Sequence, residues 1–120
     1  MNVVSIRGAI TIEKNDKKLI LQNTAYLISE IINKNNLDKD DIVSIFFTAT
    51  RDLDEVYPAK AARDMGLTNC SLLCSQEMYV KNSLTKCIRV MMLVNSLKTQ
   101  REVKNIYLKD AIKLRPDLVD

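Results

Sequence analysis

An arginine stands inside the most apolar stretch of the chain, which runs from Cys87 to Val94. The length of this stretch and its β-branched residues predict a buried strand, in which Arg89 shares a face with Cys87 and Met91. A guanidinium buried without a partner is costly, so the pattern predicts an anion beside Arg89. That anion is either a carboxylate of the protein or a bound ligand, and this stretch alone leaves both open.

Three further arginines occupy expected strand or helix positions rather than loops. Arg7 lies beside Gly8, where the missing side chain leaves room for a close approach. Arg63 follows Lys60 by about one turn of a short helix, and Arg115 ends the last expected strand. Guanidinium forks bind carboxylates through paired hydrogen bonds, so the four arginines suit a small polyanion. Each one taken singly also fits a surface position or a salt bridge.

Other side chains that could take part in binding or catalysis lie in the neighbouring segments. Glu77 ends an expected strand and is the best internal partner for Arg89. Tyr107 offers a phenol in an apolar strand, although a half-buried core aromatic has the same pattern. Cys74 and Cys87 are by default small core residues.

The composition excludes several classes of function. The chain has 120 residues, 47% of them hydrophobic and 28% charged, which predicts one globular domain over residues 1–120. A net charge of +3, with few aromatic residues and no tryptophan, gives no indication of nucleic-acid binding. No signal pattern or membrane-length apolar run is present, so we expect no membrane association.

The chain contains no histidine, which excludes the Ser-His and Cys-His types of nucleophile. Its three cysteines, Cys70, Cys74 and Cys87, lack the spacing of metal ligands. We therefore expect no metal site. Free thiols in an odd number indicate a cytoplasmic protein.

Hydrophobic periodicity predicts an α+β domain, with a mixed sheet of about five strands packed on one long helix. Strands are expected at residues 3–10, 42–48, 71–75, 87–94 and 106–107, with a last one at 111–114. The long helix is expected at 16–33, a short one at 58–65 and a helical turn at 98–103. One layer of helix leaves the other sheet face uncovered, and oligomerisation through that face is our hypothesis.

Seven segments, in order and across nearly the whole chain, resemble the monofunctional bacterial chorismate mutases that form pseudo-α/β-barrel trimers. They are IRGA at 6–9, TATRDL at 48–53, YPAKAAR at 57–63, CSQEM at 74–78, KCIRVMM at 86–92, IYL at 106–108 and LRPD at 114–117. The resemblance implies the conversion of chorismate to prephenate, an intramolecular [3,3] rearrangement on the route to phenylalanine and tyrosine. It implies no cofactor, and a homotrimer with sites between adjacent subunits.

The resemblance also assigns roles to individual residues. It implies that Arg89 donates to the ether oxygen of the breaking C–O bond, where removing such a donor costs ~10²–10³ in rate. Glu77 corresponds to a carboxylate that meets the ring hydroxyl and the ring, and Cys74 to a residue near that hydroxyl. Arg7 and Tyr107 correspond to groups that hold a substrate carboxylate.

Further positions correspond to the walls and the mouth of the family's site. In the family, a neighbouring subunit supplies one face of the site, and the residues of this chain that correspond to that face are Tyr57, Ala59, Lys60 and Arg63. Ring-contacting wall positions correspond to Leu72 and Leu73. Leu114 is counted with the substrate-binding positions, beside Arg115 near the mouth.

The chain departs from the family in a few places. Asn82 stands where a glycine is usual, and Asn tolerates the left-handed backbone better than other residues with a side chain. Leu73 replaces a hydroxyl residue that some members carry, and the tail after Arg115 is short. Two other readings stay open: a catalytically silent trimeric module that binds dicarboxylates, and an interaction domain in which Arg89 and Glu77 only pair in the core.

Overall fold

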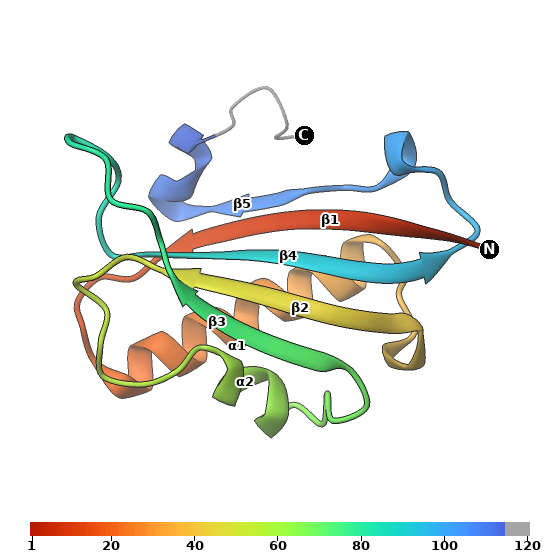
Figure 1. The fold of residues 1–120 in the computed structure, drawn as a ribbon, viewed down its shortest axis with the longest axis horizontal. Coiled ribbons are helices and arrows are strands. Elements are labelled where there is room, and N and C mark those ends of the chain that lie inside the picture. Colours follow the sequence, from red (N-terminus) through yellow and green to blue (C-terminus); the bar gives the residue numbers. More distant parts are fainter. Residues whose placement is uncertain (115–120) are drawn as a thin grey trace.

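The computed structural model describes residues 1–114, in which a five-stranded mixed sheet carries two α-helices on one face (Figure 1). The strand order is β3-β2-β4-β1-β5, with β4 antiparallel to β1 and β2, and with β5 and β3 parallel to β1 and β2 respectively. The strands are β1 Asn2–Thr11, β2 Ile42–Ala49, β3 Ser71–Gln76, β4 Cys87–Ser96 and β5 Ile106–Leu108. The α-helices are α1 Lys17–Lys34 and α2 Ala59–Asp64, and 3₁₀ helices cover Lys39–Asp41, Gln100–Glu102 and Lys109–Leu114. The predicted α+β class is confirmed.

Helix α1 begins and ends where its sequence indicates. The Asp16 side chain accepts a hydrogen bond from the Leu19 amide at 3.0 Å, which caps the first turn. At the other end Asn35 is buried, and its amide group donates to Ile31 O and Lys104 O, both at 2.9 Å. This one side chain therefore closes the helix and also anchors the segment that leads into β5.

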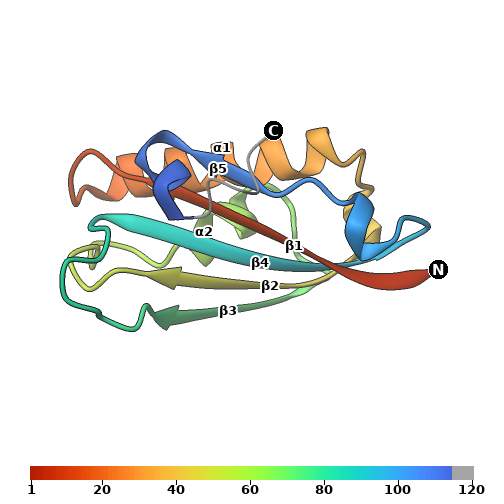
Figure 2. The ribbon, with the colours of Figure 1, turned by 90° about the horizontal axis from the view of Figure 1, so that it is seen from above.

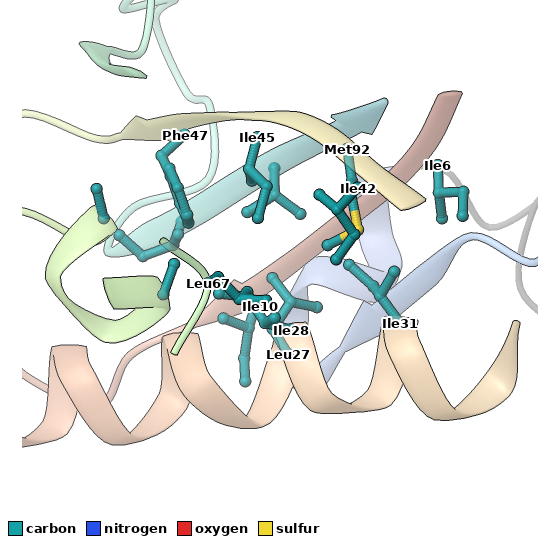
Figure 3. Packing of buried hydrophobic residues seen from close by; sticks show 14 of the residues in the cluster. Ile6, Ile10, Leu27, Ile28, Ile31, Ile42, Ile45, Phe47, Leu67 and Met92 are labelled. Carbon is teal, nitrogen blue, oxygen red and sulfur yellow. The ribbon is translucent and has the colours of Figure 1, made fainter. Parts of the chain in front are cut away.

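The main core lies between the sheet and the helices. Figure 3 shows side chains of the strands, among them Ile6, Ile45 and Met92, on the side of the sheet that α1 covers, with Ile28 and Ile31 of α1 facing them. Alternation along each strand places every second residue on this face. Figure 2 shows both helices on this one side of the sheet.

Gly8 lies on the covered face, and the close approach predicted there is made by α1. A Cβ at this position would lie 2.8 Å from Ile31 Cδ1, 3.1 Å from Ile106 O and 3.2 Å from Leu27 Cδ1. The missing side chain therefore lets the helix pack directly on β1.

Within residues 1–114, the second face of the sheet carries no α-helix, and apolar residues on it are exposed, among them Leu73 at 58% and Met91 at 42%. The prediction of a strand buried on both sides at 87–94 is therefore wrong for the single chain. Ile88, Val90 and Met92 are buried, whereas Arg89 between them has 52% of its side-chain surface exposed. The cause is the single layer of α-helices, which covers only the face of the sheet to which Ile88, Val90 and Met92 point.

The predicted strand at 111–114 is also wrong, because this segment is a 3₁₀ helix, Lys109–Leu114. Lys109 has a φ of 55°, which turns the chain out of β5. Residues three apart lie on the same side of a 3₁₀ helix, so Ala111 and Leu114 both pack on a small cluster with Tyr107. In the described part of the chain, no helix is both long and apolar enough to cross a membrane.

Candidate active site

One row of residues crosses the uncovered face of the sheet. Thr48 of β2 pairs with Arg89 of β4, Arg89 pairs with Ala9 of β1, and Ala9 pairs with Tyr107 of β5. Residues paired across a sheet point to the same face, so the ladder aligns these four side chains. The register thus brings together residues that lie as far apart in the sequence as Ala9 and Tyr107.

Glu77 joins this row from the end of β3. Its amide donates to Ala49 O at 2.9 Å, and its side-chain Oε1 lies 3.5 Å from Arg89 Nε. The Thr48 hydroxyl donates to the same Oε1 at 2.6 Å. The prediction that Glu77 is the internal partner of Arg89 is therefore confirmed, but the pair lies at the surface and not in the core.

Arg7 lies on the same face, two residues before Ala9 on β1 and paired with Met91 of β4. It is half-buried, and its amide donates to Asn105 Oδ1 at 2.8 Å. The two arginines therefore lie on neighbouring strands of one face, displaced by one side-chain repeat. Such a pair of cations suits an anionic ligand.

Tyr107 closes the row at the β5 side. It is 8% exposed and packs with Ala9, Cys87 and Ala111, while Leu114 lies against the same cluster. Burial raises the pKa of the Cys87 thiol to about 11, so this sulfur stays protonated at neutral pH. The row thus runs from an open polar end at Arg89 to a closed apolar end.

A second group of predicted residues lies around a different hollow. Tyr57 and Cys74 line a hollow of about 580 Å³, whose wall includes Phe47, Leu53 and Pro58. Tyr57 is strongly exposed, and Cys74 is partly buried against the main core. The described residues that line this hollow do not include the two arginines or the tyrosine of the row.

Helix α2 carries the other residues predicted for the neighbouring subunit. Ala59 is buried in the main core, and Lys60 forms an ion pair with Asp64 at 3.0 Å. Arg63 is exposed, with its side chain outside the row that contains Arg89. The structure of one chain therefore does not gather the predicted residues into one site.

The two predicted wall positions, Leu72 and Leu73, lie on opposite faces of the sheet. Leu72 packs against the main core, whereas its neighbour Leu73 is exposed on the uncovered face. These two wall positions point to opposite sides of β3, as alternation requires. Arg115 lies outside the described residues.

The loop from β3 to β4 borders Glu77 and contains contacts that the sequence did not indicate. The Arg51 guanidinium lies 3.9 Å from the centre of the Tyr79 ring, a cation–π contact. Both side chains, together with Glu77, line a second hollow of about 250 Å³. Asn82 has a φ of 64°, so the left-handed backbone expected at this position is confirmed.

Two comparisons of the sequence decide the family. The family model described as chorismate mutase type I matches residues 3–118. The chorismate mutase AroH of Bacillus subtilis strain 168 is 42% identical over 119 residues, which is 98% of this chain and 94% of the relative. The chain belongs to the chorismate mutase type I family. The chorismate mutase AroH of Thermus thermophilus is 38% identical over 117 residues, with 97% of this chain and 96% of the relative covered.

A solved structure agrees with this membership. A chorismate mutase from Clostridium thermocellum superimposes with a TM-score of 0.88 and is 48% identical, covering 89% of this chain and 96% of that one. The resemblance stated from the seven sequence segments is thereby confirmed. The α+β sheet of this chain is the fold of a chorismate mutase.

Sequence reasoning missed two side chains that hold the row in place. Thr48 belongs to one of the seven segments but received no role, and Asn105 was not considered. Their contacts, Thr48 to Glu77 and Asn105 to the Arg7 amide, join residues 29 and 98 positions apart. Only the register of the sheet brings them together, and periodicity gives no signal for it.

Proposed function

We propose that the uncovered face of the sheet carries the catalytic half of a chorismate mutase site, with Arg89 at its centre. The observation that carries the proposal is that the Arg89 side chain is half exposed and contacts Glu77 through Nε at 3.5 Å. This contact uses the inner edge of the fork, so its terminal nitrogens can donate to a ligand.

The family reaction converts chorismate to prephenate by breaking a C–O bond and forming a C–C bond within one molecule. Negative charge develops on the ether oxygen as the C–O bond stretches, and Arg89 donates to that oxygen. Glu77 meets the ring hydroxyl, while Arg7 and Tyr107 hold a carboxylate. No proton changes place in this reaction, so a chain without histidine can perform it.

The second half of the site, in this proposal, comes from a neighbouring copy of the chain. Tyr57 and Cys74 border a hollow that the Arg89 row does not line, and Arg63 lies on α2. A second copy would supply these residues to the first, and a homotrimer closes such head-to-tail contacts into a ring. The exposed Leu73 and Met91 on the uncovered face support an apolar contact between copies.

We also place the enzyme in the cytoplasm. Cys70, Cys74 and Cys87 are all free thiols, which fits a reducing compartment. Its product would enter the synthesis of phenylalanine and tyrosine.

The test is a turnover assay with the purified protein and chorismate, in which loss of chorismate is followed and the product is identified. We expect prephenate, and we expect Arg89→Ala to abolish its accelerated formation. Arg101→Ala is the control, because Arg101 is an exposed arginine of the Gln100–Glu102 helix. A folded assembly that binds chorismate without accelerating its loss would overturn the proposal in favour of a silent binding module.

A further inference from the structure

Among the residues that the structure describes, the Glu77 carboxylate is held through only one of its two oxygens. Within residues 1–114, its side-chain hydrogen bond and its ion pair both go to Oε1, from Thr48 Oγ1 at 2.6 Å and from Arg89 Nε at 3.5 Å. The Thr48 contact is short enough for a strong hydrogen bond to a charged acceptor, whereas the Arg89 contact is long for one. The position of Glu77 Oε1 is therefore set mainly by its hydrogen bond with the Thr48 hydroxyl.

An unrestrained carboxylate beside a guanidinium prefers a different arrangement. Arginine and carboxylate groups commonly form two parallel hydrogen bonds at about 2.7–2.9 Å, with both oxygens on the fork. In that arrangement Glu77 would occupy a terminal nitrogen of Arg89 as well as Nε. The guanidinium would then have fewer donors for a ligand, and both carboxylate oxygens would be occupied.

The backbone gives Thr48 the geometry to prevent this closure. Thr48 lies directly opposite Arg89 in the β2–β4 ladder, and its neighbour Ala49 accepts the Glu77 amide at 2.9 Å. Main chain and side chain of Glu77 are thus both fixed to consecutive residues of β2. A β-branched threonine has few χ1 rotamers, so its hydroxyl is a stiff anchor.

We propose that Thr48 is a positioning residue that keeps Glu77 from forming a bidentate ion pair with Arg89. By holding Oε1, it leaves Oε2 and the terminal nitrogens of Arg89 for the substrate. This inference rests on the proposed roles of Glu77 and Arg89 in the conversion of chorismate.

The experiment compares Thr48→Val, which keeps the shape but removes the hydroxyl, with Thr48→Ser, which restores a donor. Both are made in the full chain, alone and together with Glu77→Ala, and kcat, KM and thermal unfolding are measured. Thr68→Val is the control, since Thr68 is an exposed loop residue with the same chemical change.

We expect Thr48→Val to lower kcat by about tenfold, with a smaller change in KM, while Thr48→Ser stays within about twofold of the parent. In the Glu77→Ala background, Thr48→Val should have no further effect on kcat, because the carboxylate that it positions is gone. A crystal structure of Thr48→Val should show Glu77 on a terminal nitrogen of Arg89.

Equal losses in Thr48→Val and Thr48→Ser, or a loss that persists in the Glu77→Ala background, would assign Thr48 a packing role and overturn the inference. So would full activity of Thr48→Val when Glu77→Ala is inactive. Full activity of Glu77→Ala has a different meaning, because it would refute the proposed role of Glu77 itself.

Discussion

Arg89 and Tyr107 lie on either side of the same residue, Ala9, in one row of the sheet. Two strand spacings of about 4.8 Å therefore set their separation, whatever their side chains contact. On the Tyr107 side the row is closed by Ala111, and on the Arg89 side it is open. Arg89 thus pairs directly with Ala9, a member of a buried apolar cluster, and surroundings of low dielectric strengthen the effect of a cation on nearby charge.

The replacement Arg89→Lys should separate catalysis from stability. We expect kcat to fall by ~10²–10³, because a single ammonium does not reproduce the donors of the guanidinium. The free energy of unfolding should change by less than about 1 kcal/mol, since the ion pair with Glu77 is partly exposed and lysine keeps the positive charge. Steady-state kinetics and urea unfolding of the same preparation measure both quantities.

The matched control is Arg101→Lys, which should leave both kcat and stability unchanged. Severe destabilisation by Arg89→Lys, at unchanged kcat per folded protein, would restore the reading in which Arg89 and Glu77 only support the fold.

The close contact between β1 and α1 gives a prediction about stability. Gly8→Ala should lower the free energy of unfolding by about 1–3 kcal/mol, because the new methyl group would lie 2.8 Å from Ile31 Cδ1. Ile31→Val removes that Cδ1 atom. The double variant should therefore lose less than the sum of the two single losses in chemical denaturation. Strict additivity would show that the Ile31 contact is not the cause.

Much of the fold could be predicted from the sequence, because the covered face has a simple pattern. Ile6 and Ile10 share one face of β1, with Arg7 on the other, and Leu27, Ile28 and Ile31 recur at helical spacing in α1. Each pattern has one physical explanation, which is burial on the side where sheet and helix meet.

The uncovered face could not be predicted in the same way. Met91 and Leu73 are apolar, and an apolar residue looks the same in the sequence whether a helix covers it or nothing in its own chain does. This is why the burial of Arg89 was overestimated. The contact of Thr48 with Glu77 spans 29 residues and depends on the register between β2 and β3, which no local pattern contains.

The buried Cys87 thiol predicts a loss of stability at high pH. Its pKa is raised to about 11 in the folded chain, mainly by burial, whereas an exposed thiol titrates at about 8.5. Above pH 9 the unfolded chain releases this proton while the folded chain keeps it, so the free energy of unfolding falls as pH rises. The contribution, roughly 3 kcal/mol, is present below pH 9 and is lost as pH rises to 11.

Urea unfolding at pH 8, 9, 10 and 11 measures this loss. Because lysines and tyrosines titrate in the same range, the comparison is with Cys87→Ala, which should show a shallower decline. Parallel declines in the two proteins would contradict the assignment of this pH dependence to Cys87.

The proposed sharing of each site between two copies can be tested by mixing inactive variants. Arg89→Ala removes the guanidinium from the row on the uncovered face. Arg63→Ala removes the guanidinium of a residue of α2 that the neighbouring copy would supply. Each variant alone should be nearly inactive. When the two are refolded together in equal amounts, about one quarter of the sites should combine two intact halves, because a shared site takes one half from each adjacent copy.

The control mixture joins Arg89→Ala with Arg7→Ala, two residues of the same face. No site in this mixture regains both arginines, because each face comes from a single chain and every chain lacks one of the two. Activity should therefore stay at the level of the single variants. Recovery in the first mixture alone therefore requires that Arg63 and Arg89 act on one substrate from different copies. If neither mixture recovers although mixed assemblies form, Arg63 and Arg89 act from the same chain, and the proposed division of the site is wrong.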